Sequence, residues 1–513
     1  MESIVHEDEH LLVVNKPAGW NTHSPGPFAN EGLYEWLKNR EPRWSRLAII
    51  HRLDKETSGV MLFGKAPEAN RSLSHQFEDR RVRKKYLFLT DRPSARSSFD
   101  AVSDLIRVNE RYKSGPGGQR AETHFRLLST EGGRFLWEAE PRTGRTHQIR
   151  VHASEHGIPI VGDVMYGGSP AARIHLHAAE LALRHPVTGQ PVVFRSAPNF
   201  AEPMFRQLRA APIDPALTNA YRLVHGAADG WPGLYVDKWH DYLLAESERP
   251  LASSSLAFLR GLPAKGIYHK LRSRQPVKQP AQLIAGEPAP ENFLARENGL
   301  QFQARFAESG SAGLFLDQRD NRRRLLTGYV AGGFELREPR AVLNTFAYTC
   351  AFSVAAAARG AKVTSVDLSR RYLEWGRENF AANQMAPDQH EFLTGDAFRW
   401  LARLTRQQRQ FDIVILDPPT FSRSKENGVF SVEKDYGRLL AAALPLVQPG
   451  GVLLASTNAA TYPPKEFLLS VEQSLTQCRR RAARQHYIPQ PPDFPIHHLE
   501  PAYLKTVWVE LAN

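Results

Sequence analysis

The chain has 513 residues, of which 42% are hydrophobic and 23% are charged. This composition excludes a long disordered chain, and the length predicts about three domains of usual size. The formal net charge of +12 favours a polyanionic partner such as nucleic acid. Two cysteines, Cys350 and Cys478, are too few for a disulfide framework, and no apolar run is long enough to span a membrane. With no signal peptide in the first residues, we expect a cytoplasmic protein without a membrane partner.

Residues 1–210 predict a first domain of α+β type with a mixed, largely antiparallel sheet. Short β-like runs are separated by Gly and Pro turns, and a helix is expected over 68–80. The expected strands lie at 11–14, 60–63, 86–89 and 135–139. Two prolines within residues 211–215 predict a hinge after this domain.

The rest of the chain predicts two further blocks. Residues 217–307 form a smaller α+β block, and residues 308–513 alternate strand and helix, as in the helical pattern over 370–383. The expected strands of the last block lie at 342–343, 362–366, 411–416 and 451–456. This alternation indicates a parallel, doubly wound α/β sheet.

The first candidate site centres on the loop at 51–59, which reads His-Arg-Leu-Asp-Lys-Glu-Thr-Ser-Gly. The loop separates two apolar runs, so the carboxylate of Asp54 can be held at a cleft. Taken alone, the same residues are also typical of a polar turn.

Five other motifs accompany this loop in chain order, at 12–19, 84–86, 143–152, 159–163 and 176–178. Together they resemble the RluA-type pseudouridine synthase family over nearly all of residues 1–200. The resemblance implies that Asp54 is the catalytic carboxylate and that Arg150 is its basic partner. It also implies that Tyr86 stacks on the target base and that Arg52 enters the space left by the flipped base. No metal or organic cofactor is implied for this half.

The implied reaction breaks the carbon–nitrogen glycosidic bond of uridine, rotates the base and rejoins it through carbon 5. A carboxylate can add to the anomeric carbon or remove the neighbouring sugar proton, and the sequence leaves both routes open. The target must be flipped out of the stacked RNA. Other interpretations are that Tyr86 is a core aromatic and that Arg150 is a structural ion-pair partner. Basic residues over 80–85 are expected to contact phosphates.

The second candidate site follows the logic of nucleotide binding in doubly wound folds. A strand, a tight loop and a helix span 341–353, and Asp367 ends the next strand about 20 residues on, where an acid accepts hydrogen bonds from ribose hydroxyls. Asp396 follows a further strand, beside the expected position of an adenine. The turn at 417–421 reads Asp-Pro-Pro-Thr-Phe and is typical of methyltransferases that act on planar bases. Its prolines stiffen the turn, and Phe421 can stack on a base.

Motifs at 221–226, 313–322, 343–353 and 417–425 resemble large-subunit ribosomal RNA methyltransferases. The resemblance implies a small central domain at 217–307, a Rossmann-like class I domain at 308–513, and S-adenosylmethionine as cofactor. The implied cofactor-binding residues are Gln318, Arg319, Asn344, Phe346, Tyr348, Asp367, Asp396 and Asp417. The implied substrate-binding residues are Pro418, Pro419 and Phe421. One departure is Cys350, which stands where the relatives usually have Gly; a side chain that crowds the loop would weaken cofactor binding.

The chemistry of methyl transfer narrows the choice of acceptor atom. Methylation of carbon 5 of cytosine needs a covalent thiolate adduct, and the cytosine enzymes carry a Ser-Cys-Ser type motif where this chain reads Ser-Thr-Asn-Ala at 456–459. Guanine N7 has a lone pair and needs only alignment with the methyl donor. The stretches at 369–375 and 417–425 also look more like the guanine-N7 type. We therefore favour guanine N7 over 5-methylcytosine, and methylation of an exocyclic amine stays open.

The sequence thus predicts a bifunctional RNA-modification enzyme whose substrate is RNA, with 23S rRNA favoured and tRNA as the alternative. DNA is not expected as a partner, no metal site is expected, and the oligomeric state is open. One rival hypothesis makes the methyltransferase half a degenerate RNA-binding module that serves the synthase. Another makes the protein a methyltransferase of small molecules or protein, against which the combination of Asp54, Tyr86 and Arg150 argues.

Overall fold

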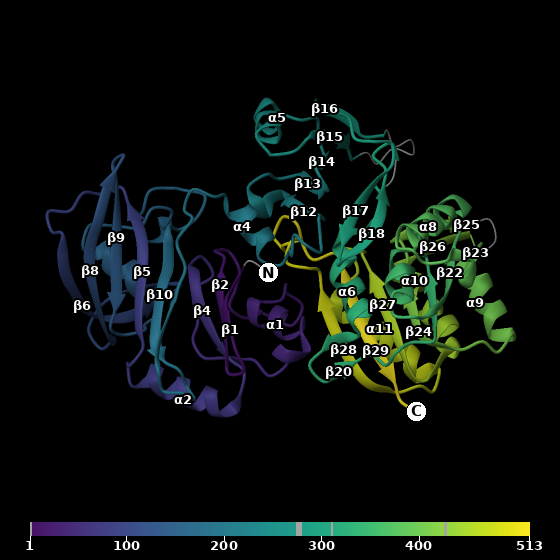
Figure 1. The fold of residues 1–513 in the computed structure, drawn as a ribbon, viewed down its shortest axis with the longest axis horizontal. Helices are drawn as coiled ribbons and strands as arrows, with labels where there is room; N and C mark the ends of the chain where they lie inside the picture. The colour runs from purple at the N-terminus through teal and green to yellow at the C-terminus, as the bar shows by residue number, and fades with distance from the viewer. Residues whose placement is uncertain (1–2, 273–279, 309–310, 425–427) are drawn as a thin grey trace. The chain divides into compact units, whose positions relative to one another are not determined.

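The computed structural model describes residues 3–272, 280–308, 311–424 and 428–513 (Figure 1) and divides into two compact units. Unit 1 comprises Met1–Pro25, Gly32–Lys38 and Arg43–Asp214, and unit 2 comprises Gly26–Glu31, Asn39–Pro42 and Pro215–Asn513. The division of the chain at 210, 217 and 307 stays a prediction.

Unit 1 is built on an eleven-stranded mixed sheet within the described residues. The strand order is β1-β2-β4-β10-β5-β9-β8-β6-β7, with β3 beside β4 and β11 beside β10. Only the β4–β10 pair is parallel among the described strand pairs of this sheet, which confirms the expected, largely antiparallel α+β fold. The strands are β1 (Ile4–Glu7), β2 (Leu11–Lys16), β3 (Ala48–Ile49), β4 (Ser58–Gly64), β5 (Arg83–Thr90), β6 (Ser98–Val108), β7 (Arg111–Ser114), β8 (Gln119–Glu131), β9 (Arg134–Pro141), β10 (Leu176–Arg184) and β11 (Pro191–Arg195). The helices are α1 (Leu33–Lys38), α2 (Pro67–Glu78), α3 (Gln148–Glu155) and α4 (Met204–Ala210).

Strand β4 is a fully buried strand of unit 1 and directly follows the loop that carries Asp54. All seven of its residues are buried, as expected of a strand covered on both faces. Gly59 has a φ of 120°, and a Cβ there would lie 2.2 Å from the carbonyl oxygen of Ala178 on β10. Since any side chain would push the two strands apart, glycine is required at this position of the 51–59 motif.

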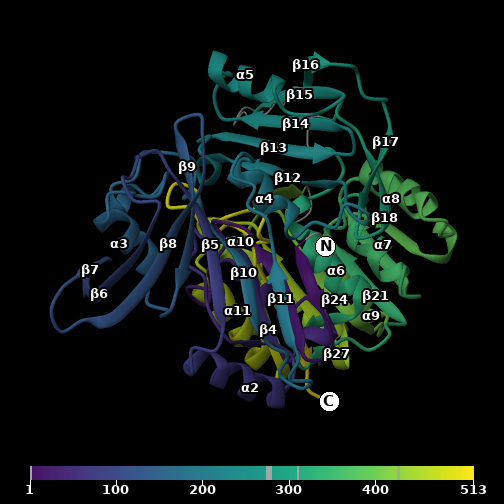
Figure 2. The ribbon, with the colours of Figure 1, turned by 60° about the vertical axis from the view of Figure 1, so that its left-hand side comes forward.

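Unit 2 contains a seven-stranded sheet in the order β23-β22-β21-β24-β27-β29-β28 and a five-stranded sheet in the order β12-β13-β14-β15-β16 (Figures 1 and 2). The strands of the larger sheet are β21 (Ala341–Thr345), β22 (Lys362–Asp367), β23 (Glu391–Thr394), β24 (Phe411–Leu416), β27 (Val447–Thr457), β28 (Ala482–Pro489) and β29 (Lys505–Leu511). Those of the smaller sheet are β12 (Ala220–His225), β13 (Leu234–Trp239), β14 (Tyr242–Ser247), β15 (Gly266–Leu271) and β16 (Gln282–Gly286). Three hairpins complete the strands: β17 (Phe293–Glu297) with β18 (Leu300–Ala304), β19 (Tyr329–Ala331) with β20 (Phe334–Glu335), and β25 (Phe421–Ser424) with β26 (Gly428–Ser431).

Helices cover both faces of the seven-stranded sheet. They are α6 (Arg319–Thr327), α7 (Ala351–Ala357), α8 (Arg370–Ala382), α9 (Ala397–Arg406), α10 (Val432–Ala443) and α11 (Pro464–Gln477). Helix α5 (Ser253–Arg260) lies beside the five-stranded sheet instead (Figures 1 and 2). Successive residues of β24 enter different cores: Val414 packs with α10 and α11, whereas Ile413 and Ile415 pack with α6 and α7. This two-residue alternation explains why the strands read as continuous apolar runs. The four pairs that join β21, β22, β23, β24 and β27 are parallel, which confirms the Rossmann-like expectation.

No helix within the described ranges is long and apolar enough to cross a membrane.

Candidate active sites

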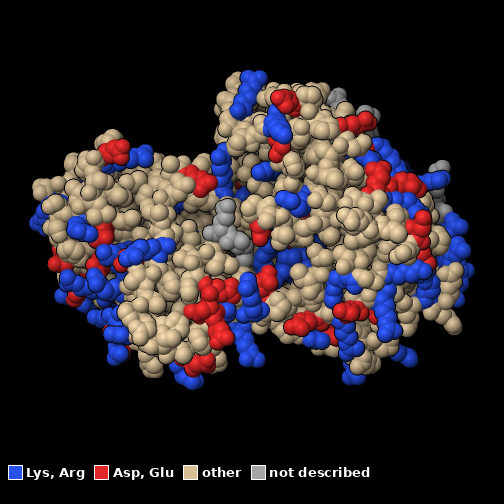
Figure 3. Space-filling model, viewed as in Figure 1, with Lys and Arg blue, Asp and Glu red and all other residues tan. Residues whose placement is uncertain are grey.

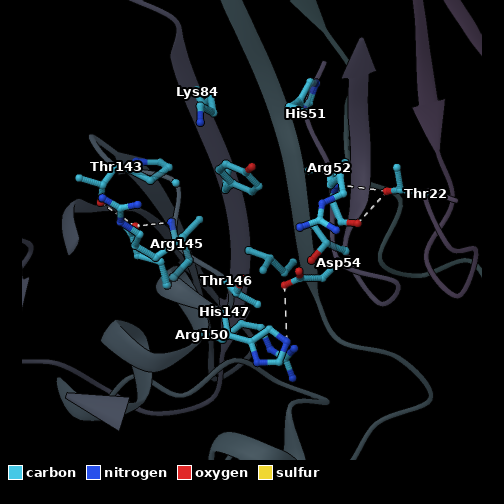
Figure 4. A pocket seen from close by; sticks show the side chains of 18 of the residues that line it. Thr22, His51, Arg52, Asp54, Lys84, Thr143, Arg145, Thr146, His147 and Arg150 are labelled. Atoms are coloured by element: carbon cyan, nitrogen blue, oxygen red, sulfur yellow. Dashed lines mark hydrogen bonds and ion pairs between the residues drawn. The ribbon is translucent and has the colours of Figure 1, made fainter. Parts of the chain in front are cut away.

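Unit 1 holds an open cavity of about 730 Å³ that is lined by all four residues predicted as catalytic, Arg52, Asp54, Tyr86 and Arg150. Figure 4 shows Arg52, Asp54 and Arg150 in this cavity. Arg52 and Asp54 come from the loop before β4, Tyr86 from β5, and Arg150 from α3. Arg52 is exposed and Asp54 is half-buried. Residues that are far apart in the sequence therefore meet around one space that is open to a large substrate.

Hydrogen bonds from two buried side chains, Thr22 and Lys16, fix the backbone of the loop that carries Asp54. The Oγ1 atom of Thr22 donates to the carbonyl of Leu53 at 2.9 Å. Lys16 is completely buried, and its Nζ atom donates to the carbonyls of Pro17, Trp20 and Lys55 at 3.0, 2.8 and 3.1 Å. Burial lowers the pKa of Lys16 to about 7, although the nearby carboxylates of Glu56 and Asp54 oppose the change. Lys16 lies in the 12–19 motif, but no feature of that motif assigned it to the site.

Arg150 is engaged differently from the expectation. Its Nε and Nη2 atoms form a bidentate ion pair with Asp163 at 2.6 and 2.8 Å, and its guanidinium lies 5.0 Å from the ring of Tyr166. Burial opposes the change, but the hydrogen bonds and charge of Asp163, followed by the charge of Asp54, raise the pKa of Arg150. Arg150 is thus a structural ion-pair partner whose positive charge still acts on Asp54.

Asp54 faces His147, whose Nε2 atom lies 3.9 Å from Oδ2 of the carboxylate (Figure 4). Burial and the charge of Arg150 lower the pKa of His147, whereas the charges of Asp54 and Asp163 oppose this change. Burial and the charge of Asp54 raise the pKa of Tyr86, so its phenol stays protonated. His147 was missed as a site residue; its only signal was its place in the 143–152 motif.

The cavity rim is basic. Arg80 and Lys84 from the predicted phosphate-binding cluster line it, together with Arg142 and Arg145. Lys and Arg side chains (blue) also gather over the lower part of unit 1 on the face shown in Figure 3. A rim of this kind attracts a phosphate backbone without reading its sequence.

In unit 2, a second and much smaller cavity lies at the carboxyl edge of β21 and β22. Its lining includes Phe346, Asp367, Asp396, Phe398 and Phe430. Asp367 ends β22 and accepts the backbone N–H groups of Tyr348 at 2.9 Å and Ser369 at 2.8 Å, while burial raises its pKa. Two of the predicted carboxylates, from different strand ends, are therefore brought to one space.

The chemistry of this cavity fits an adenosine, since two carboxylates can accept ribose hydroxyls and aromatic rings can face a purine. Its free volume is about 20 Å³, which is room for about one water molecule. Ser422 and Gly428 of the β25–β26 hairpin also line it.

Asp417 follows the end of β24 and is joined to Gln318. The Nε2 atom of Gln318 donates to Asp417 Oδ1 at 3.0 Å and to Ser456 Oγ at 2.8 Å. Burial, followed by the charge of Asp317, raises the pKa of Asp417 to about 7. Two predicted cofactor residues thus form one polar cluster at the strand edge.

Only Phe346, Asp367 and Asp396 of the eight predicted cofactor residues are among the described residues that line the cavity; Gln318, Arg319, Asn344, Tyr348 and Asp417 are not. Arg319 and Asn344 are engaged elsewhere. Arg319 forms a bidentate ion pair with Asp493 at 2.7 Å for both bonds, and Asn344 donates to Ser353 at 2.9 Å. Both side chains are buried, so they support the site instead of reaching a ligand. Sequence reasoning could not find Asp493, because it lies 174 residues further along the chain.

The remaining predicted residues differ in exposure. Tyr348 donates from its hydroxyl to the carbonyl of Ser311 at 3.0 Å. Pro418 is buried, whereas Pro419 is exposed and Phe421 is 64% exposed. Lys425, the end of the 417–425 motif, lies outside the described residues.

Cys350 does not crowd the cavity. It adopts left-handed backbone angles, with a φ of 61°, as do Phe346 and Tyr348 in the same loop. Its thiol is buried toward α8, where a Cβ on Gly376 would lie 2.4 Å from the sulfur. Because Gly376 of α8 has no side chain, it leaves the space that the Cys350 side chain occupies.

Comparisons with known proteins divide along the chain in the same way. Residues 10–155 match the family of RNA pseudouridylate synthases, and residues 261–508 match the family of S-adenosylmethionine-dependent methyltransferases. The chain is 38% identical over 213 residues to the ribosomal large subunit pseudouridine synthase D of Zymomonas mobilis. The aligned part covers 37% of this chain and 67% of that protein. It is 32% identical over 307 residues to a ribosomal RNA large subunit methyltransferase of Deinococcus radiodurans. The aligned part covers 57% of this chain and 73% of that protein. The crystal structure of SMU.776 complexed with SAH matches with a TM-score of 0.52 and 30% identity over 64% of this chain and 86% of that one.

Proposed function

Since the chain belongs both to the RNA pseudouridylate synthases, through its N-terminal part, and to the S-adenosylmethionine-dependent methyltransferases, through its C-terminal part, we propose that it isomerises a uridine and methylates a guanine of large-subunit ribosomal RNA. The relatives named for large-subunit ribosomal RNA support this substrate for both halves. The observation that carries the proposal is that each unit has its own cavity with the acids that its chemistry needs.

In the synthase site, Asp54 is the reacting carboxylate. The bond between C1′ and N1 of uridine breaks, the base turns, and a bond forms between C1′ and C5. The hydrogen on C5 then leaves as a proton and N1 gains one, so the net change is an isomerisation. Arg52 fills the space left by the flipped base, and the protonated Tyr86 stacks on the target. The open, basic cavity supports this assignment because a flipped nucleotide and its flanking phosphates need room and cations.

In the methyltransferase site, Asp367 and Asp396 hold the nucleoside part of the cofactor, and Asp417 with Gln318 orients the reacting groups. When bound, S-adenosylmethionine supplies a methyl group on a positively charged sulfur. The exposed Phe421, four residues after Asp417 in the chain, stacks on the target base.

The positions of both cysteines support a ring nitrogen over carbon 5 as the methyl acceptor. Cys350 is 0% exposed, and Cys478 caps α11 and packs against the core of the sheet. Burial raises the pKa of both thiols, and that of Cys350 reaches about 12. Neither thiol lines the cofactor cavity, so the nucleophile that cytosine C5 methylation requires is not supplied there. Guanine N7 needs no nucleophile and loses no proton, which makes it the acceptor we favour.

The test is mass spectrometry of nucleosides from the ribosomal RNA of cells that lack the gene. Complementation with Asp54→Ala should restore the methylated guanosine but not the pseudouridine, and Asp417→Ala should do the opposite. Asp104→Ala, an exposed acid in unit 1, is the matched control and should restore both. A methyl group on cytosine C5 or on an exocyclic amine would contradict the N7 assignment. Restoration of both modifications by Asp54→Ala would contradict the synthase site.

Calorimetry of S-adenosylmethionine binding addresses the remaining rival. If the full chain did not bind the cofactor, the methyltransferase half would be an RNA-binding module instead of an enzyme.

A further inference from the structure

A third cavity, of about 600 Å³, lies within unit 2 and shares no lining residue with the cofactor cavity among the described residues. Its walls come from β12 to β15, from the 3₁₀ turn Leu316–Gln318 and from the segment 494–503. None of the sequence motifs assigned a role to this space.

One end of this cavity lies against the Asp417 cluster. Asp317 lines the cavity and directly precedes Gln318, which donates to Asp417. The charge of Asp317 contributes, after burial, to the raised pKa of Asp417, so the two carboxylates are within electrostatic reach. Ala460, just beyond the end of β27, lines the same cavity. A ligand in this space would therefore meet the reacting edge of the methyltransferase site.

The walls combine aromatic rings with balanced charges. The guanidinium of Arg272 lies 4.0 Å from the ring of Tyr235 and pairs with Glu246 at 2.9 Å. Arg222 lies 4.6 Å from the ring of Phe494 and forms an ion pair with Asp237. Because carboxylates neutralise these cations, the cavity suits a flat, uncharged base better than a phosphate.

The carboxylates of the cavity differ in what they already bind. Asp237 and Glu246 are paired with arginines, and Glu500 accepts the N–H of Ala227 at 2.9 Å and the hydroxyl of Tyr235 at 3.1 Å. Asp317 accepts a hydrogen bond from Tyr503. A carboxylate has about four acceptor positions, so Asp317 keeps capacity for further donors.

Two adjacent donors that match one carboxylate are a property of guanine. Its N1–H and its 2-amino group lie side by side, whereas adenine, cytosine and uracil each offer a single donor group on this edge. A guanine held by this edge leaves N7 free on the other ring. Phe315, 46% exposed among the lining residues, offers a face for the base.

We propose that this cavity receives the flipped target guanine and that Asp317 determines specificity by accepting from its N1–H and 2-amino groups. This inference rests on the proposed guanine methyltransferase function and deepens it.

The test uses the full chain, S-adenosylmethionine and large-subunit ribosomal RNA from cells that lack the gene. Asp317→Asn keeps the size of the side chain but turns one acceptor into a donor, which opposes the guanine amino group. We expect kcat/KM for RNA to fall by about 10- to 100-fold, the range for loss of a bidentate base contact. The Kd for S-adenosylmethionine, measured by calorimetry, should stay within about twofold, which also shows that the variant folds. Asp388→Asn, a fully exposed acid in the same unit, is the matched control and should change neither value.

A second measurement does not depend on the variant's stability. In a synthetic fragment that spans the methylated nucleotide, inosine replaces the target guanosine and so removes the 2-amino group. The wild type should lose activity on this RNA by about tenfold, the cost of one lost hydrogen bond to a charged group, and Asp317→Asn should lose little further.

Three results would overturn the inference. The first is full activity of Asp317→Asn on RNA with guanosine at the target position. The second is an equal loss of activity on the inosine RNA in the wild type and in Asp317→Asn. The third is a weaker affinity of Asp317→Asn for S-adenosylmethionine that accounts for its lower rate, which would make the cavity part of the cofactor site. If instead the wild type itself methylated another base, the proposed function would fail first, and the inference with it.

Discussion

Replacing Asp417 by Asn should stabilise unit 2 at alkaline pH while it removes methyl transfer. Asp417 is held where its charged form is disfavoured, because burial and the neighbouring Asp317 raise its pKa from 3.8 to about 7. The folded state therefore binds a proton more tightly than the unfolded state does. For such a group, the contribution to stability is fully present below the unfolded pKa and is lost as the pH rises through the folded pKa.

The size of this effect follows from the two pKa values. At pH 5 the folded protein holds the proton on Asp417 and the unfolded chain has released it, which contributes about 2.5 kcal/mol to the free energy of unfolding. At pH 8 both states are ionised and the contribution is about 0 kcal/mol. The Asn side chain is uncharged at both pH values and can still accept from Gln318. The wild type should thus lose roughly 2.5 kcal/mol relative to Asp417→Asn between pH 5 and pH 8.

The assay is urea unfolding of both proteins at pH 5, 6, 7 and 8. Because the chain has two units, the transition that S-adenosylmethionine shifts in the wild type is assigned to unit 2. The difference in unfolding free energy between variant and wild type should grow in favour of the variant as the pH rises. A difference that is the same at every pH would refute the proposed electrostatics of the site.

Three further changes probe named contacts. Asp163→Ala leaves the buried guanidinium of Arg150 without its carboxylate and should destabilise unit 1 by about 3–5 kcal/mol. The double change Asp163→Leu with Arg150→Met removes both charges and should lower the free energy of unfolding by less. Urea unfolding that found the double variant less stable than Asp163→Ala would contradict this expectation. Phe421→Ala should weaken RNA binding by about 1–3 kcal/mol because stacking on the base is lost, whereas Phe421→Trp should keep the wild-type affinity. Equal affinities of the wild type and Phe421→Ala in a filter-binding titration would exclude a stacking role. Lys16→Met removes the ammonium donor from the carbonyls of Pro17, Trp20 and Lys55 and so loosens the loop that carries Asp54. It should suppress pseudouridine formation but not methyl transfer, and equal loss of both reactions would refute a local role.

The synthase fold and the composition of its cavity could be predicted because local motifs carry them. The apolar strands and the order of the motifs indicated the sheet, and Asp54, Tyr86 and Arg52 line one cavity. The partner of Arg150 could not be predicted in the same way. Asp163 lies in a motif, but only the folded chain shows that its carboxylate, and not that of Asp54, forms the bidentate pair.

In unit 2, the strand-ending acids were predictable and the surroundings were not. Asp367 and Asp396 are marked by their places after apolar strands, and both line the cofactor cavity. Phe398 and Phe430 also line that cavity. The spacing of apolar residues around them predicts only whether each lies in a helix or a strand, not that its ring faces the cofactor cavity. The partner of Arg319 lies on a distant segment, because ion pairing across the fold leaves no periodic signal in the sequence.

The central claim is that two independent active sites share one polypeptide. A single reaction tests it, with RNA that carries tritium on C5 of its uridines and S-adenosylmethionine that carries ¹⁴C in its methyl group. Pseudouridine formation releases the C5 tritium into water, and methylation transfers ¹⁴C to RNA. We expect Asp54→Asn to abolish only the release of tritium and Asp417→Asn to abolish only the transfer of ¹⁴C. Loss of both signals in either variant, despite a folded protein, or loss of neither, would contradict the account.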